Sequence, residues 1–427
     1  MDASNQIDEP RQESADRWIQ FAWWLTIAAI GLRIFHFMRN PPIWCDEKWI
    51  LRNITDKTFL EQLGPLFDIQ AAPPLFLWGE RSIWLLFGDN IFALRALPLL
   101  ASCLGMLLLY RIGRIVLTSA AIPWAVFVFG FSNNLLDYTC EVKPYVIDAF
   151  FALAITWLFL ETRAWRLGSR MLLFSAITPL VIFSSYPGCF ICGSLLTAFL
   201  PSVWQERRSW QTWTAYGLLT LVVFGAFALI YLGPIRAQRT EILDSVWDDY
   251  PNWREPWMVP LWTAGVIFRL FEHFWRPTGV ILVIPLLIGI WMRRRTSSWA
   301  ELALLAGPAG LALFATFLGK YPFESRLILF VLPGLSVLIG AGMAELTCWT
   351  NDLIRSSNRR DALRRRTVIL GMALAFNVAL IVPFGKTAYH LVVPLKRLWI
   401  EEWPPVRAQS PASTIMPQVA TGARPGT

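Results

Sequence analysis

Two acidic residues, Asp46 and Glu47, follow Trp44 early in the chain. A carboxylate can take the proton of a hydroxyl nucleophile when the two groups lie within hydrogen-bonding distance, near 3 Å. The pair is therefore a candidate for the general base of a transfer reaction. The alternative is that both are solvated loop acids, because acidic side chains are mostly exposed.

Further charged and polar residues stand at two later junctions between apolar segments. They are Glu141, Lys143, Tyr145 and Asp148 at the first junction, and Lys320, Tyr321 and Arg326 at the second. Arginine binds a phosphate with two parallel donors, and lysine binds it as a point charge. Cations that stabilise a departing phosphate, beside a carboxylate that activates an acceptor, would perform group transfer from a lipid phosphate. The alternative is that the lysines and arginines anchor helix ends at a membrane surface.

Asp148 lies seven residues beyond Glu141, on the same face of a predicted helix and just inside it. Exposure to lipid would be costly for a carboxylate, which favours a position that faces a cavity. Glu141, Tyr145, Asp148 and Tyr321 are therefore candidates for the walls of a substrate pocket.

The composition indicates a membrane protein. Of the 427 residues, 55% are hydrophobic and only 16% are charged, whereas a soluble domain carries about 25% charge. The net charge of +8 comes mostly from bases in short loops, and no nucleic-acid-binding signature accompanies them. An ordinary cytosolic enzyme and a nucleic-acid partner are excluded.

The apolar residues form blocks of the length that spans a bilayer, about 20 residues per helix. We predict an all-α polytopic membrane protein with about eleven transmembrane helices. The predicted spans are residues 18–37, 92–110, 120–136, 145–160, 171–186, 188–204, 212–232, 278–292, 299–318, 327–346 and 367–384.

Clusters of basic residues set the predicted topology, because they stay on the cytoplasmic side. This rule places 1–17 in the cytoplasm, and it places outside the membrane a first loop at 38–91, a second large loop at 233–277 and a tail at 386–427 with a disordered end. The domain that holds the helices is 18–385.

Two apolar segments are ambiguous. Residues 73–87 could cross the membrane, but then every later basic cluster would change sides, so we expect an amphipathic juxtamembrane helix with Glu80 and Arg81 at the surface. Residues 257–271 are either a second such helix or a short re-entrant one. On this topology Cys45 and Cys140 face an oxidising compartment, so that a disulfide between them is an open alternative.

Several motifs resemble the GT-C superfamily of membrane glycosyltransferases. They are Trp44-Cys45-Asp46-Glu47, Gln70-Ala71-Ala72-Pro73-Pro74-Leu75-Phe76, Phe87-Gly88-Asp89, Ala93-Leu94-Arg95-Ala96-Leu97-Pro98, Glu141-Val142-Lys143-Pro144-Tyr145 and Tyr321-Pro322-Phe323-Glu324-Ser325-Arg326. The similar branch contains the protein O-mannosyltransferases and the lipid A aminoarabinose and galacturonosyl transferases.

The resemblance implies a polyprenyl-phosphate sugar donor, an external active site and usually inversion at the anomeric carbon. It implies that Asp46 or Glu47 is the base or helps to hold a divalent cation, and that Lys143 and Arg326 bind the donor phosphate. Lys320, in the same external junction as Arg326, is a further candidate for binding this phosphate. No organic cofactor is implied. Two departures are Lys48, where many members have a small residue, and Ala72, where several have histidine.

The sequence thus predicts a single-sugar glycosyltransferase of the bacterial inner membrane, with a lipid, glycan or protein acceptor on the external face. The alternative is a transporter or flippase for a lipid-linked glycan, which would also need a polar cavity among its helices.

Overall fold

The computed structural model describes residues 9–246, 249–276, 278–296 and 299–355. All regular structure in these residues is helical, which confirms the predicted all-α class. The predicted span at 367–384, the tail at 386–427 and residues 1–8 of the predicted N-terminal segment lie outside the described ranges.

Eight helices or continuous helix runs in these ranges are long and apolar enough to cross a membrane. They are Glu13–Met38, Ile91–Val116, Tyr145–Ala164, Leu167–Ser184, Gly188–Gln205, Trp210–Gln238, Trp299–Phe317 and Ser325–Thr350. They coincide with eight of the eleven predicted spans, and the fold is that of a polytopic membrane protein.

Two predicted spans differ from the structure. Residues 120–136 form two short helices, α5 (Ile122–Gly130) and α6 (Asn133–Tyr138). The break occurs because Ser132 caps a new helix, with its Oγ accepting a hydrogen bond from the Leu135 amide at 3.4 Å. Residues 278–292 begin as a 3₁₀ turn, η6 (Thr278–Leu282), and continue as α14 (Val283–Thr296), which is too short to cross about 30 Å of hydrocarbon alone.

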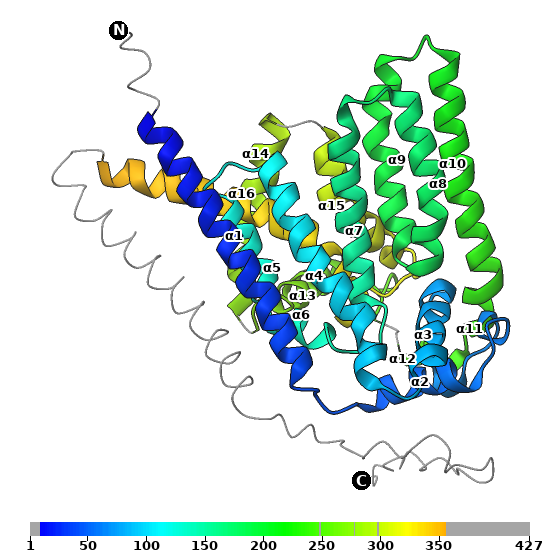
Figure 1. The fold of residues 1–427 in the computed structure, drawn as a ribbon. Helices are drawn as coiled ribbons and strands as arrows, with labels where there is room; N and C mark the ends of the chain where they lie inside the picture. The colour runs from blue at the N-terminus through cyan, green and yellow to red at the C-terminus, as the bar shows by residue number, and fades with distance from the viewer. Residues whose placement is uncertain (1–8, 247–248, 277, 297–298, 356–427) are drawn as a thin grey trace, which may run out of the picture.

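The remaining elements occur in this chain order: α1 (Glu9–Met38), α2 (Cys45–Asp56), η1 (Glu61–Leu63), η2 (Phe67–Ile69), α3 (Pro74–Phe87), α4 (Ile91–Val116), α7 (Tyr145–Glu161), η3 (Thr162–Ala164), α8 (Leu167–Ser184), α9 (Gly188–Gln205), α10 (Trp210–Ile230), η4 (Tyr231–Ile235), α11 (Arg236–Gln238), α12 (Glu241–Val246), η5 (Pro256–Met258), α13 (Val259–Glu272), α15 (Trp299–Phe317), η7 (Ser325–Val331) and α16 (Leu332–Arg355). Helices α7, α8, α9 and α10 run alongside one another, and α2, α3, α11 and α12 gather at one end of the bundle (Figure 1). We call this end the site end.

Arg33 ties three helices together within the bundle. Its Nε donates to Ser102 Oγ at 2.8 Å, and its Nη1 donates to the carbonyl oxygens of Ala29 and Gly130, both at 2.9 Å. An ionisable side chain inside a membrane span is expected to face the protein interior and to find such partners. Arg33 therefore fixes α1 against α4 and α5.

Close backbone packing joins α14 to α16. A Cβ atom on Gly289 would collide with the carbonyl oxygen of Leu338, and one on Gly342 would collide with that of Pro285. Small residues at helix contacts allow this approach, which is a common way of packing helices in lipid.

The segment between α1 and α4 builds a small apolar core of its own. Ile50 and Ile54 of α2 pack with Phe76 and Leu77 of α3 and with Leu94 of α4. Helix α3 confirms the helix predicted at 73–87, and it is anchored on protein rather than lying alone on a surface. Its apolar end stays exposed at Leu85, Leu86 and Phe87.

Glu80 differs from the expected surface position. Arg81 does lie at the edge, where its Nη1 donates to the carbonyl oxygen of Ile54 at 2.8 Å, but Glu80 is fully buried. Neither of its carboxylate oxygens has a hydrogen-bond partner among the described residues. Burial raises the pKa of Glu80 well above its ordinary value, with a smaller effect from the nearby charge of Glu47.

Candidate active site

Helix α2 presents two acids at its first turn. It begins at Cys45 because Trp44 is extended, and Asp46 and Glu47 follow with both side chains buried. The positive end of the helix dipole favours negative charge there. The apolar residues of α2 pack on α3 and α4, so that the helix start is held at the site end.

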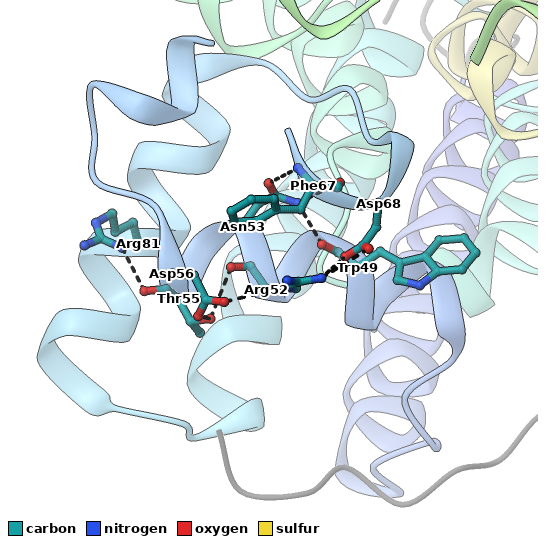
Figure 2. Close-up of polar contacts among 8 residues, drawn as sticks. All are labelled: Trp49, Arg52, Asn53, Thr55, Asp56, Phe67, Asp68 and Arg81. Carbon is teal, nitrogen blue, oxygen red and sulfur yellow. Dashed lines mark hydrogen bonds and ion pairs between the residues drawn. The ribbon is translucent and has the colours of Figure 1, made fainter. Parts of the chain in front are cut away.

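A network of polar contacts fixes the segment that follows α2 (Figure 2). Asn53 Oδ1 accepts the Phe67 amide at 2.7 Å, and Asn53 Nδ2 donates to the Phe67 carbonyl oxygen at 3.2 Å. Arg52 Nη1 pairs with Asp68 Oδ1 at 3.3 Å. Asp68 and Ile69 have positive φ angles of 58° and 56°, which is costly for residues other than glycine. The network holds this conformation and thereby sets the position of the next residue, Gln70.

Four side chains from four parts of the chain converge on one another. Asp46 Oδ2 lies 3.1 Å from Lys143 Nζ and 2.8 Å from Arg326 Nη2. Gln70 bridges the pair, because its Nε2 donates to Asp46 Oδ1 at 3.0 Å and its Oε1 accepts from Lys143 Nζ at 2.7 Å. We call Asp46, Gln70, Lys143 and Arg326 the ionic cluster.

Aromatic rings enclose the arginine of the ionic cluster. The guanidinium carbon of Arg326 lies 5.3 Å from the ring centre of Trp44 and 5.4 Å from that of Tyr145. Both are cation–π distances. Asp46 and Lys143 are about 95% buried, at 5% and 4% exposed, so their charges interact with little screening by water.

The pKa values of the cluster follow from this burial and charge. Burial would raise the pKa of Asp46, but the charges of Lys143 and Arg326, with the hydrogen bond from Gln70, outweigh it and hold the pKa below its ordinary value. Burial lowers the pKa of Lys143 to about 8, although the charge of Asp46 opposes the shift. Asp46 is therefore ionised at neutral pH. Lys143 loses its proton at a pH only slightly above neutral.

Glu47 is engaged in a separate buried ion pair. Arg95 Nε and Nη2 donate to its two carboxylate oxygens at 2.8 and 2.7 Å, and the Val142 amide donates to Oε1 at 3.1 Å. Arg95 also donates to Asn40 Oδ1 at 3.0 Å and to the Pro41 carbonyl oxygen at 2.7 Å. The pair joins α2 to α4 and to the residues before α7, which orients Asp46 toward Lys143.

The other predicted site residues divide into two groups. Glu141 is buried and lies near Tyr145, and Tyr321 lies near both Tyr145 and Asp148. Lys320, by contrast, is exposed. The structure therefore brings Glu141, Tyr145, Asp148 and Tyr321 to the region of the ionic cluster and leaves Lys320 outside it.

The residue types alone do not predict two of the side chains in these contacts. Gln70 and Arg95 both occur in the motifs quoted above, but a neutral amide and an arginine at a helix start give no signal of their partners. The only sequence signal is their position within motifs that also contain Asp46 and Glu47.

The residues present do not favour a cation at Asp46. Its carboxylate already faces Lys143 and Arg326, which repel a metal ion. Among the described residues no three His, Cys, Asp or Glu side chains gather closely enough to hold one. Cys45 and Cys140 are both free thiols.

No protein-family model matches the chain, and no curated protein matches it. Solved structures do. The oligosaccharyltransferase of Archaeoglobus fulgidus, in complex with zinc and sulfate, is 15% identical with a TM-score of 0.51, over 86% of this chain and 53% of that one. The same enzyme, AglB, with an inhibitory peptide and a dolichol-phosphate gives 14% identity and a TM-score of 0.50, over 86% and 56%.

ArnT from Cupriavidus metallidurans, bound to undecaprenyl phosphate, is 12% identical with a TM-score of 0.49, over 86% of this chain and 74% of that one. This chain spans about half the length of the oligosaccharyltransferase. The fold of this chain is accordingly similar to that of the archaeal oligosaccharyltransferase.

Proposed function

We propose that this protein is an integral membrane glycosyltransferase that moves a single sugar from a polyprenyl-phosphate donor to an acceptor, with inversion. The observation that carries the proposal is the buried carboxylate of Asp46 between Lys143 and Arg326. The proposed base, Asp46, thus contacts both proposed phosphate-binding cations directly, at the end of an apolar bundle.

The first step is donor binding. The donor phosphate takes the place of the Asp46 carboxylate between Lys143 and Arg326, while the polyprenyl chain stays in lipid. Arg326 offers a planar donor fork and Lys143 a point charge, which suits a phosphate. Asp46 loses its two counter-ions and gains an anionic neighbour, so that its affinity for a proton rises.

The second step is transfer. Asp46 accepts the proton of the acceptor nucleophile, the nucleophile bonds to the anomeric carbon, and the bond from that carbon to the phosphate oxygen breaks. The phosphate keeps the electron pair, and Lys143 and Arg326 stabilise the added charge. A single displacement of this kind inverts the anomeric centre. Glu47 is assigned a positioning role through Arg95 rather than that of the base.

The solved relatives support the classes of substrate. AglB is seen with a dolichol-phosphate and a peptide, and the fold of this chain is similar. A polyprenyl phosphate on the donor side and a lipid, glycan or protein acceptor are therefore proposed. The zinc in the related structure keeps a divalent cation open as a partner, bound with the substrate rather than at Asp46 alone.

The position of the charges favours transfer over transport. A transporter for a lipid-linked glycan would place polar residues near the middle of broken helices. Here Asp46 of the ionic cluster belongs to the first turn of α2, and α2 lies at the site end of the bundle (Figure 1). We assign this end to the external face of the inner membrane, with the N-terminus in the cytoplasm, on the strength of the loop charges.

The test is transfer by the purified protein in lipid nanodiscs, supplied with undecaprenyl-phosphate sugars and a panel of lipid, glycan and peptide acceptors. Mass spectrometry of the products should show a single added sugar and released undecaprenyl phosphate. Asp46→Asn should lower the rate at least a hundredfold, in line with the loss of a general base. Asp56→Asn, at the exposed end of the same helix, is the matched control and should keep the wild-type rate. Equal rates for the two variants would remove Asp46 from catalysis.

A further inference from the structure

A second group of buried polar side chains lies one helical turn from Tyr145, whose ring contacts Arg326 of the ionic cluster. Asp148 follows Tyr145 by three residues on α7, so that the two share a face. Ser185, which directly follows α8, lies beside Asp148. The side chains are 4% and 0% exposed.

These two groups have few hydrogen-bond partners. Among the described residues, Asp148 Oδ1 and Ser185 Oγ have no hydrogen-bond partner other than each other. Buried polar atoms in folded proteins are nearly always paired, and a carboxylate with a hydroxyl can form more hydrogen bonds than these two form between themselves. Two adjacent buried groups with unused hydrogen-bonding capacity therefore indicate a place where a polar ligand binds.

Aromatic residues border the same place. Tyr321 lies near Asp148 and near Tyr250 of the segment before α13. The Tyr321 hydroxyl is already used, since it donates to the Leu327 carbonyl oxygen at 2.6 Å, and its ring packs edge-on against Phe190 at 4.9 Å. Tyr321 therefore offers a fixed ring rather than a free donor.

Tyr145 connects this group to the phosphate-binding side. Its ring contacts the Arg326 guanidinium on one side, and Tyr321 lies near it on the other. A sugar linked to a phosphate that lies between Lys143 and Arg326 extends from that phosphate by only one sugar ring. A sugar ring is about as wide as one side chain. The ring would thus reach the turn of α7 that carries Asp148.

We infer that Asp148 and Ser185 form the subsite that binds hydroxyl groups of the donor sugar. This inference rests on the proposed function and adds the residues that recognise the sugar of the donor. The Asp148 carboxylate accepts a hydrogen bond from one ring hydroxyl, and Ser185 Oγ pairs with a neighbouring one. A site built to bond a hydroxyl discriminates strongly against a ligand that lacks it.

Binding measurements separate this subsite from the phosphate site. Undecaprenyl phosphate and a panel of undecaprenyl-phosphate hexoses and pentoses would be titrated into the wild-type protein, Asp148→Asn and Ser185→Ala in nanodiscs. The wild type should bind at least one sugar-bearing lipid more tightly than undecaprenyl phosphate. Asp148→Asn should lose about tenfold or more of that gain, as expected for a hydrogen bond to a charged group, and Ser185→Ala about three- to tenfold. Both variants should bind undecaprenyl phosphate within twofold of wild type.

The control is Glu161→Gln, an exposed acid at the other end of α7, which should change neither affinity. The inference is overturned if no sugar-bearing lipid gains affinity in the wild type, or if the gain persists in both variants. A wrong proposed function gives a different result from a wrong sugar subsite. In that case undecaprenyl phosphate itself would bind equally well to wild type and to Lys143→Ala. Ser185→Ala removes one oxygen only and carries the test if Asp148→Asn does not fold.

Discussion

Asp46, Lys143 and Arg326 neutralise one another in the structure. A buried charge without a partner costs several kcal/mol, so removing one member of this group would leave that cost in place. In the proposed mechanism the three groups exchange partners when a donor phosphate binds. That exchange would link the activation of Asp46 to the presence of donor.

The lowered pKa of Lys143 predicts a pH limit for donor binding. Burial lowers its pKa to about 8, and only the charged ammonium attracts a phosphate. The value of kcat/KM for the donor should therefore be maintained below pH 8 and should fall as the pH rises through that value, because kcat/KM reports the free enzyme.

Lys143→Arg is the matched variant, because a guanidinium stays protonated over this range. The variant should keep its donor kcat/KM to higher pH than the wild type, whatever its absolute rate. A fall at the same pH in both proteins would assign the titration to another group.

Glu80 predicts a pH dependence of stability. Its pKa in the folded protein is raised, so that between the ordinary value of 4.5 and the raised value the unfolded state ionises while the folded state does not. The contribution of Glu80 to the free energy of unfolding is therefore fully present below its ordinary pKa. Between the ordinary and the raised pKa this contribution falls as the pH rises, by about 1.4 kcal/mol per pH unit for one group.

Glu80→Gln removes this dependence. Thermal unfolding of the variant should show a higher midpoint than wild type at pH 8 and a smaller difference at pH 5. A difference that is larger at pH 5 would contradict the buried, protonated state of Glu80.

The partners of the acids show which part of the site can be predicted from the residues. The sequence motifs identify Asp46, Lys143 and Arg326 as polar residues at junctions, and the structure brings them together. They do not show that Glu47 pairs with Arg95, which lies 48 residues later in the chain. A single sequence contains no information on which of two adjacent acids turns toward which cation, because that depends on how α2 is rotated against α4.

Among the helices, the length and apolar composition of a segment predict its position well where one continuous helix is long enough to cross the membrane. Eight predicted spans coincide with long apolar helices of the structure. Residues 120–136 form two helices in place of the single helix that the apolar run predicts, because a serine inside the run, Ser132, acts as a cap. A serine in such a run is equally compatible with an uninterrupted helix, so the break depends on the contacts of α6, including the bond from Ser132 Oγ to the His273 carbonyl oxygen at 2.5 Å.

The contact between α14 and α16 predicts a stability effect. Gly342→Ala would place a methyl group against the Pro285 carbonyl oxygen, and such overpacking costs about 1–3 kcal/mol. Gly310→Ala in α15, where nothing lies within 4 Å of the added atom, should be neutral or slightly stabilising.

Thermal unfolding in one detergent would compare the two variants with wild type. The expected order of midpoints is Gly342→Ala below wild type and Gly310→Ala at or above it. A Gly342→Ala variant as stable as Gly310→Ala would contradict the close contact between α14 and α16.

For the whole molecule, the loop charges predict an orientation. Arg293, Arg294 and Arg295 end α14, and basic loops stay in the cytoplasm. A reporter fused after Arg295 should be active in the cytoplasm, and one placed at Lys320 should be active outside. The reverse pattern would place the ionic cluster on the cytoplasmic face and would overturn the proposed side of the reaction.

In the proposed mechanism the donor phosphate replaces Asp46 between Lys143 and Arg326. A crystal or cryo-EM structure of the protein with undecaprenyl phosphate would show whether this replacement occurs. We expect the phosphate oxygens within hydrogen-bonding distance of Lys143 Nζ and Arg326 Nη2, with the Asp46 carboxylate turned away from both. A phosphate bound elsewhere, with both ion pairs of Asp46 intact, would contradict the account.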